Sequence, residues 1–420
     1  MASTDAGFQL QDEADATAEN AVKEIRPSPP RWSYVVLAVA VLAMSTGGIW
    51  FALLGTFGTP PLMMACWRLT LTAFLQLFGV AFELHAVNTA GLWRRFRQSG
   101  VLLTCSGVAL AIHFGSWGWS VSRTTLLDSL LLVSSVPLLL VLIQTVRWLF
   151  RRYIRTAPVK SHGAAHLHPV TPSSDDVLQG PYVSVAGESP ADSMTASQST
   201  SWFQLLCCPL HQPPPTWLEA LGAVSGFLGV LVLLLLTPVA VEAPNSTAVA
   251  TVAGNLAALL GAAAIIPYLE VGASCRQFIP LFIYAFPVTL IAAVTLAVAS
   301  LAFEPTTRVT SVGPTALFGF FGHAERAGYA LSAAAVSGIA GHTLMNLAVK
   351  YVSPLVVGVA VLWEPLLGSF LGYFANVQGP PDVMSLVATP LLLGGALLVT
   401  LGGRGGPWVV PSCRQASVVE

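Results

Sequence analysis

Residues 279 to 302 read IPLFIYAFPVTLIAAVTLAVASLA and contain no charged side chain. An α-helix rises about 1.5 Å per residue, so roughly 20 apolar residues cross the ~30 Å hydrocarbon core of a bilayer. Lipid offers no hydrogen-bond partner to irregular backbone, which leaves a helix as the structure for one such segment. This stretch is therefore predicted to be a transmembrane helix.

Similar apolar runs stand on both sides of this stretch. The 420 residues are 54% hydrophobic and only 9% charged, whereas soluble domains carry about 25% charged residues. We predict an all-α polytopic membrane protein with ten transmembrane helices. The predicted spans are residues 33 to 54, 62 to 83, 100 to 120, 125 to 146, 217 to 237, 251 to 269, 279 to 302, 328 to 349, 353 to 375 and 384 to 403.

The distribution of basic residues predicts the orientation, because loops on the cytosolic side carry the excess of Lys and Arg. Placing the N-terminus in the cytosol puts 15 of the 19 basic residues in cytosolic segments. Arg123, Arg308 and Arg326 fall on the other side, and Arg68 lies within a span. Both termini are therefore predicted to be cytosolic, in the plasma membrane or an endomembrane.

Three segments outside the spans are predicted to be cytosolic. Residues 1 to 32 and the loop 147 to 216 are expected to be disordered, and residues 404 to 420 form a tail. From residue 156 the loop is rich in Ser, Pro and Asp and cannot bury enough apolar surface to fold alone. On the opposite side, Asn245 begins an Asn-Ser-Thr acceptor sequence for N-glycosylation.

The chain also carries a weak internal repeat. The fifth span contains GAVSGFLG, residues 222 to 229, and the tenth contains GALLVTLG, residues 395 to 402. Pro137 in the fourth span and Pro365 in the ninth each precede two leucines. Because five is an odd number of spans, the second repeat must be inverted relative to the first, as in many carriers. The predicted repeats are residues 33 to 146 with 217 to 237, and residues 251 to 403.

These patterns resemble the drug/metabolite transporter superfamily, of the EamA-like type with ten helices in two five-helix repeats. The resemblance rests on PLMMACWR (61 to 68), KYVS (350 to 353), Glu364-Pro365 and the two Gly-Ala helices, and covers roughly residues 33 to 403. Asn376-Val-Gln-Gly379 stands where the family has an acidic residue. The resemblance implies a carrier for amino acids or other small metabolites that works by alternating access.

Two charged side chains within the predicted spans are candidates for contact with a solute. A charge at the bilayer centre costs about 3 kcal/mol on insertion scales, so each needs a partner or an aqueous cavity. The guanidinium of Arg68 suits a carboxylate or phosphate of a solute, and an acidic side chain of the protein is the alternative partner. Glu364 suits proton coupling or contact with an ammonium group, and a hydrogen-bonded bridge between helices is its alternative.

The remaining candidates are less polar. His113 and His342 lie 24 and 23 residues before Pro137 and Pro365, and imidazole titrates near neutral pH; packing inside the bundle is the alternative for both. Trp117 lies one helical turn after His113, so it shares that face or belongs to the aromatic belt at the membrane surface. Tyr268 and Asn346 contact a solute or bridge helices.

Composition and motifs also restrict the function. A formal net charge of -1 argues against nucleic acid as a partner. No Cys or His spacing suits a metal, and no cofactor or enzyme motif is present, such as a Gly-rich phosphate loop or HExxH. We expect a carrier for a small solute, with or without proton coupling.

Two alternative functions stay open. One is a transport-inactive scaffold or receptor that uses the 156 to 216 loop. The other is an exchanger of nucleotide sugars or phosphate esters, which needs more fixed positive charge than Arg68 supplies. Gly222 and Gly226 form a small-xxx-small face, which packs inside the bundle or makes a homodimer.

Overall fold

The computed structural model describes residues 30–86, 91–156, 216–236, 251–276, 278–348, 351–352, 357 and 360–402. Among these residues there is no β-strand, and Arg308 and Ala316 form an isolated bridge. Asn245, Lys350, the loop from residue 157 and the tail from residue 403 lie outside the described residues. The chain forms two compact units, residues 1–142 with 215–420 and residues 143–214, and the features below belong to the first unit unless stated.

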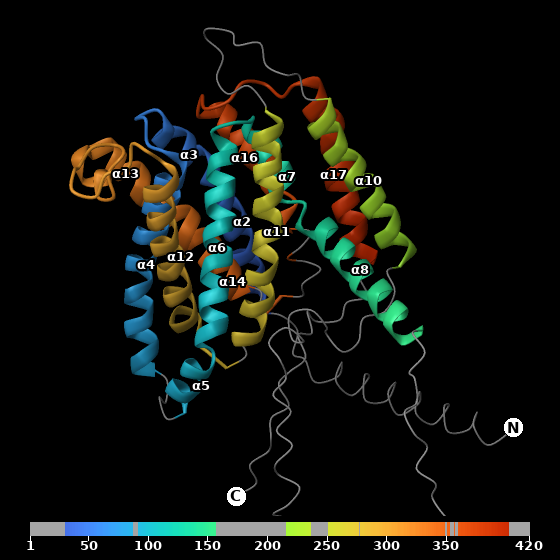
Figure 1. Cartoon of the computed structure of the whole chain (residues 1–420), viewed down its shortest axis with the longest axis horizontal. Helices are drawn as coiled ribbons and strands as arrows, with labels where there is room; N and C mark the ends of the chain where they lie inside the picture. The colour runs from blue at the N-terminus through green and yellow to red at the C-terminus, as the bar shows by residue number, and fades with distance from the viewer. Residues whose placement is uncertain are drawn as a thin grey trace, which may run out of the picture. The chain divides into compact units, whose positions relative to one another are not determined.

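Eight helical runs of the described residues are long and apolar enough to cross a membrane (Figure 1). The chain is thus a multi-pass α-helical membrane protein. These runs are α2 (Arg31–Ser45) with α3 (Gly47–Gly55), α4 (Pro61–Ala86), α6 (Gly100–Val121), α7 (Leu126–Val133) with α8 (Val136–Thr156), α10 (Trp217–Leu235), α11 (Val252–Cys275), α12 (Leu281–Phe303) and α17 (Val383–Gly402). The shorter helices are α5 (Leu92–Gln98) and the 3-10 turn η1 (Gly319–Gly322).

The eighth and ninth predicted spans are not among these eight runs. The expected span 328 to 349 is a continuous run of α13 (Ala324–Ser332), η2 (Ala333–Thr343) and α14 (Leu344–Ala348), and η2 is a π-helix. Within the expected span 353 to 375, the described helix is α16 (Glu364–Phe374). The apolar pattern predicted the position of the run α13–η2–α14. It contains no signal for the change from α-helix to π-helix within that run.

One predicted boundary was wrong. Residues 147 to 156, which we expected to begin a disordered loop, continue α8 as helix to Thr156. This segment places four arginines among Trp, Leu, Phe, Tyr and Ile, and positive side chains near a helix C-terminus interact favourably with the helix dipole. The charges therefore end the apolar span without ending the helix.

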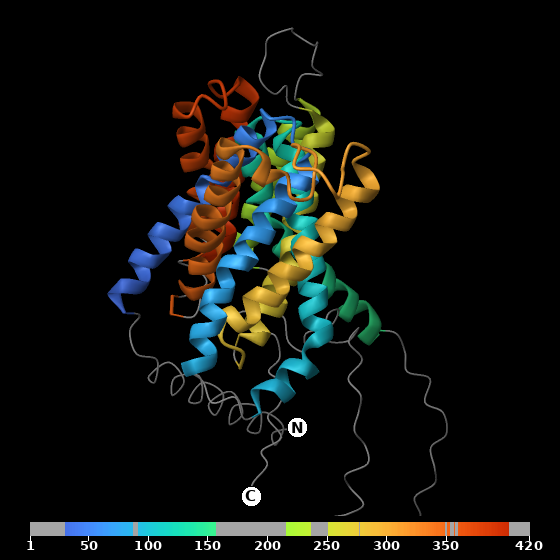
Figure 2. The ribbon, with the colours of Figure 1, turned by 90° about the vertical axis from the view of Figure 1, so that its left-hand side faces the viewer.

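The helices of the first unit pack in pairs that join the two parts of the chain (Figures 1 and 2). Helix α4 packs along α12, α6 along α11, and α2 along η2 and α14; α7 contacts α16, and α10 packs along α17. Each of these pairs joins a helix before residue 236 to one after residue 251. The core of the unit is therefore built between the two parts of the chain.

Glycines let α10 and α17 approach closely. A Cβ atom added at Gly395 would lie 2.5 Å from the backbone nitrogen of Gly226 and 2.6 Å from the carbonyl oxygen of Gly222. The small-residue face of α10 is thus covered by α17 of the same chain, which is the packing alternative for this face. A dimer through another surface stays a prediction.

Glu83 and Glu304 make reciprocal caps between α4 and α12. Glu83, near the C-terminus of α4, accepts hydrogen bonds from the backbone N–H groups of Phe282 and Ile283 at 2.8 and 3.0 Å. Glu304, at the C-terminus of α12, accepts one from the backbone N–H of Leu62 at 2.8 Å. The first N–H groups of a helix lack partners within it and attract negative charge. The two caps fasten the antiparallel pair at both ends.

Candidate functional site

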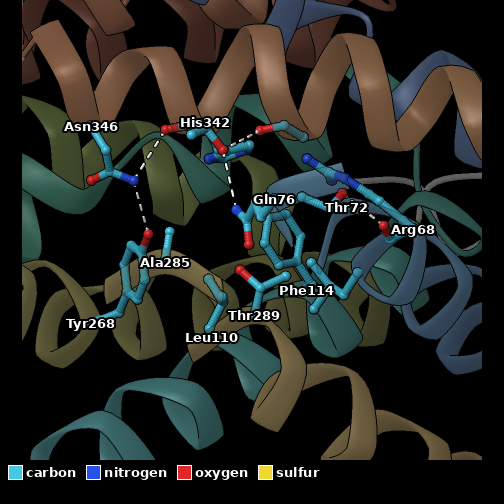
Figure 3. Close-up of a pocket in the computed structure, with 13 residues that line it drawn as sticks. Arg68, Thr72, Gln76, Leu110, Phe114, Tyr268, Ala285, Thr289, His342 and Asn346 are labelled. Atoms are coloured by element: carbon cyan, nitrogen blue, oxygen red, sulfur yellow. Dashed lines mark hydrogen bonds between the residues drawn. The ribbon is translucent and has the colours of Figure 1, made fainter. Parts of the chain in front are cut away.

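A cavity of about 30 Å³ lies inside the first unit between α4, α6, α11, α12, η2 and α14 (Figure 3). A cavity needs roughly 10–15 Å³ of this measure to hold one water molecule, so the helices must separate before a metabolite fits. Figure 3 shows His342 and Asn346 on one helix, with Tyr268 and Thr289 opposite them. The cavity is therefore lined by both polar and apolar side chains on helices from distant parts of the sequence.

Arg68 lies at this cavity and is almost completely buried, with 1% of its surface exposed. Its Nη2 donates a hydrogen bond to Ser337 Oγ at 2.8 Å, and its Cζ lies 4.3 Å from the ring centroid of Phe114. Nε and Nη1 are buried and have no hydrogen-bond partner among the described residues. A buried charge with unfilled N–H groups is costly, so Arg68 is the strongest candidate for binding a solute.

Gln76 is a second cavity side chain with an unfilled polar atom. Its Nε2 donates to Thr343 Oγ1 at 3.3 Å, and Thr343 Oγ1 donates to the carbonyl oxygen of Gly338 at 3.1 Å. Because the only hydroxyl proton of Thr343 is used in that bond, Thr343 accepts from Gln76, and this defines the orientation of the amide. Gln76 Oε1 is left buried without a donor.

Tyr268 and Asn346 lie together on another part of the cavity wall. Asn346 Nδ2 donates to the hydroxyl oxygen of Tyr268 at 3.0 Å and to the carbonyl oxygen of His342 at 3.1 Å. The carbonyl oxygen of Asn346 accepts from Arg276 Nη1 at 2.9 Å, and burial lowers the pKa of Arg276, which follows the α11 span. Both residues line the cavity and bridge helices, and contact of either with a solute stays a prediction.

His113 and Trp117 pack behind the cavity. His113 Nδ1 lies 2.9 Å from the carbonyl oxygen of Gly261, a contact that joins α6 to α11. Trp117 is buried and its ring lies edge-to-face against Phe51 at 5.2 Å between centroids. These contacts match the packing alternative for His113 and place Trp117 on the inward face.

Glu364 does not line the cavity. It is half-buried at the first position of α16, directly before Pro365, where a carboxylate interacts favourably with the helix dipole. It is also the acidic residue whose charge attracts Arg68. Its negative charge therefore influences the site from outside the cavity wall.

Four of the seven predicted site residues meet at the cavity, namely Arg68, Tyr268, His342 and Asn346. Sequence analysis missed Thr72 and Gln76, which follow Arg68 at intervals of four residues and lie on the same face of α4. This spacing was a usable signal. Among the described residues no group of three or more His, Cys, Asp or Glu side chains could hold a metal ion.

Comparisons with known proteins do not identify a family. No protein-family model matches the chain, and no curated protein matches it. One solved structure, described only as "Crystal structure of protein", has a TM-score of 0.48 and 18% sequence identity, and the match covers 88% of this chain and 97% of that chain. At this level of similarity the match assigns neither a family nor a function.

Proposed function

We propose that the protein is a carrier, not an enzyme, that moves a small solute across a membrane by alternating access, as its resemblance to EamA-like transporters implies. The observation that carries the proposal is the cavity between the two parts of the chain, where Nε and Nη1 of Arg68 are buried without a hydrogen-bond partner. Polar and ionisable groups inside a membrane protein are expensive and typically mark the path of a substrate. We also propose ten spans with both termini in the cytosol.

The helix pairs support an arrangement of two inverted repeats. In this arrangement, spans one to five are α2–α3, α4, α6, α7–α8 and α10, and the second repeat begins with α11. A two-fold axis relates each span of the first repeat to the span five places later. It therefore converts the contact between α2 and η2 into the contact between α11 and α6. The contacts α4–α12, α7–α16 and α10–α17 each join two corresponding spans, so the axis leaves them unchanged. All five pairs are in contact. Inverted repeats allow a carrier to close one end while the other opens.

The caps at Glu83 and Glu304 supply latches for this movement. They correspond under the same two-fold axis, because each joins the C-terminal end of one helix to the N-terminal end of its partner. The positive-inside rule assigns Glu83 to the cytosolic end and Glu304 to the other. Opening one end breaks the cap there and leaves the other intact.

The isosteric replacement Glu83→Gln is expected to favour opening at the cytosolic end, and Glu304→Gln at the opposite end. An amide still accepts a hydrogen bond but lacks the charge that strengthens it; a difference of 1–2 kcal/mol changes an equilibrium by about five- to thirtyfold. Thr289→Cys is introduced at the cavity wall as a reporter in both variants. The measurement is the rate at which a membrane-impermeant thiol reagent labels this cysteine when the reagent is added to one side of the membrane or to the other. Equal rates in both variants would remove the latch role.

The carrier itself is tested with purified protein in proteoliposomes. We expect saturable uptake of at least one small metabolite from a panel of acids, amino acids and sugars, measured with and without a pH gradient. A gradient requirement would add proton coupling, for which Glu364 is the candidate. If no solute moves under either condition, the carrier proposal fails.

Deleting residues 157 to 214 tests the scaffold alternative. Unchanged transport together with loss of a binding partner would show that this loop works as a docking segment. An exchanger of phosphate esters is less well supported, because Arg68 is the one cationic side chain at the described cavity.

A further inference from the structure

Two polar groups at the cavity lack partners, and their chemistry is complementary to one kind of solute. Arg68 presents buried N–H donors on Nε and Nη1, and Gln76 presents a buried acceptor, Oε1. Both side chains come from the same face of α4, with Thr72 between them. The hydroxyl of Thr72 is already used, since it donates to the carbonyl oxygen of Arg68 at 2.7 Å. The unfilled positions are thus a cationic donor and a neutral acceptor.

The surroundings of Arg68 favour a carboxylate. Its guanidinium lies over the face of Phe114 at 4.3 Å, and Nη2 is used by Ser337, so the N–H groups on Nε and Nη1 remain available to an anion. Arg68 supplies one positive charge to a low-dielectric space, and Glu364 already attracts it from outside the cavity wall, so a solute with more than one negative charge is disfavoured. A phosphate ester, which carries up to two negative charges, would leave one unbalanced, and no second Lys or Arg lies at the cavity wall described here.

Gln76 specifies the other end of the solute. Thr343 Oγ1 accepts a hydrogen bond from the Gln76 amide N–H and donates its own proton to the carbonyl oxygen of Gly338. Rotation of the amide by about 180° would therefore break the hydrogen bond between Gln76 and Thr343. Its Oε1 then requires a donor, and a buried acceptor left without one is penalised by about 1–3 kcal/mol. A hydroxyl or amino group of the solute supplies this donor, whereas an alkyl group does not.

Building on the proposed function, we infer that the solute is a small carboxylate that also carries an O–H or N–H donor, with its carboxylate on Arg68 and its donor on Gln76. Gln76 is then the residue that determines specificity. The closed state contains room for water alone, so the solute enters when one of the two caps opens.

The test measures binding of matched probes to the purified full-length protein in lipid nanodiscs by calorimetry. Glycolate, lactate, glycine and alanine carry the donor on the carbon next to the carboxylate, and γ-hydroxybutyrate and γ-aminobutyrate carry it two carbons further away. Acetate, propanoate and butanoate lack the donor, and glycolamide, lactamide and γ-hydroxybutyramide lack the carboxylate. We expect at least one acid with a donor to bind about tenfold more tightly than its matched alkanoate and its amide.

The variant Gln76→Met separates specificity from folding. Methionine has a similar length and no acceptor, and Thr343 keeps its bond to Gly338, so the thermal midpoint without ligand is the folding control. We expect the preference for the acid with a donor to fall to about one, with alkanoate affinity unchanged. A preference that survives in Gln76→Met overturns the inference, as does binding of the amides equal to that of the acids, or no binding of any probe.

Transport assays distinguish failure of the carboxylate assignment from failure of the carrier proposal. Uptake of a neutral or cationic solute into proteoliposomes would keep the carrier and overturn the carboxylate assignment. Absence of uptake for every class of solute would overturn the carrier.

Discussion

Arg68→Met is expected to abolish transport while leaving the protein at least as stable as the wild type. Taking a charge into a low-dielectric interior costs several kcal/mol per ion, and this cost is recovered only where further hydrogen bonds satisfy the buried group. Nε and Nη1 of Arg68 have no hydrogen-bond partner that would be lost. The measurements are solute uptake in proteoliposomes and the thermal unfolding midpoint in the absence of solute.

Arg326 provides a matched control for this prediction. It is also buried, but its Nε donates to the carbonyl oxygen of Gly319 and its Nη2 to that of Val312, both at 2.8 Å. Arg326→Met leaves those carbonyl groups without a donor, so we expect a loss of about 1–3 kcal/mol of stability with unchanged solute affinity. A stable Arg68→Met protein that transports normally would contradict the solute-binding role, and an unfolded one would indicate a structural role.

Gly395→Ala is expected to destabilise the protein strongly, whereas Gly394→Ala is not. The added methyl group at Gly395 would clash with backbone atoms of Gly222 and Gly226. The methyl group added at Gly394 has no other atom within 4 Å. Overpacking costs about 1–3 kcal/mol and more when backbone must shift. Alanine at an open helical position gains up to about 1 kcal/mol over glycine.

The comparison between the two glycines is made in one background by thermal unfolding in detergent. Both substitutions add the same methyl group to the same helix, so their difference isolates the contact between α10 and α17. Equal midpoints for the two variants would show that these helices do not need this close approach.

Sequence analysis could predict the helices because membrane spans follow from hydropathy and length, which are local properties. All eight candidate spans in the structure begin and end within a few residues of the predicted spans, although the helix α8 continues beyond its span to Thr156. The break between α2 and α3 at Thr46 and the π-helix η2 depend on packing: a Cβ at Gly47, for example, would touch Ser337 Oγ at 2.9 Å. Such contacts between residues far apart in sequence cannot be derived from either segment alone.

The same limit applies to the site. Arg68 was predictable because a charge within an apolar span is conspicuous. Gln76 was not chosen because a neutral amide is common in helices, and its importance depends on Thr343, a residue of another helix that determines how the amide is oriented. Glu364 was expected at the solute but lies outside the cavity wall, since sequence depth in a helix does not specify the direction of its side chain.

The π-helical segment η2 has a mechanical consequence. Hydrogen bonds in a π-helix run between residues five apart, and the side chain of Thr343 follows the same spacing when it donates to Gly338. Return of this segment to α-helical hydrogen bonding would change its register by one residue. Everything after it would then turn by about 100° and shift by about 1.5 Å along the axis. A one-residue ratchet in η2 would thus swing Asn346 of α14 away from Tyr268 and rebuild one wall of the cavity by a movement confined to this helical run.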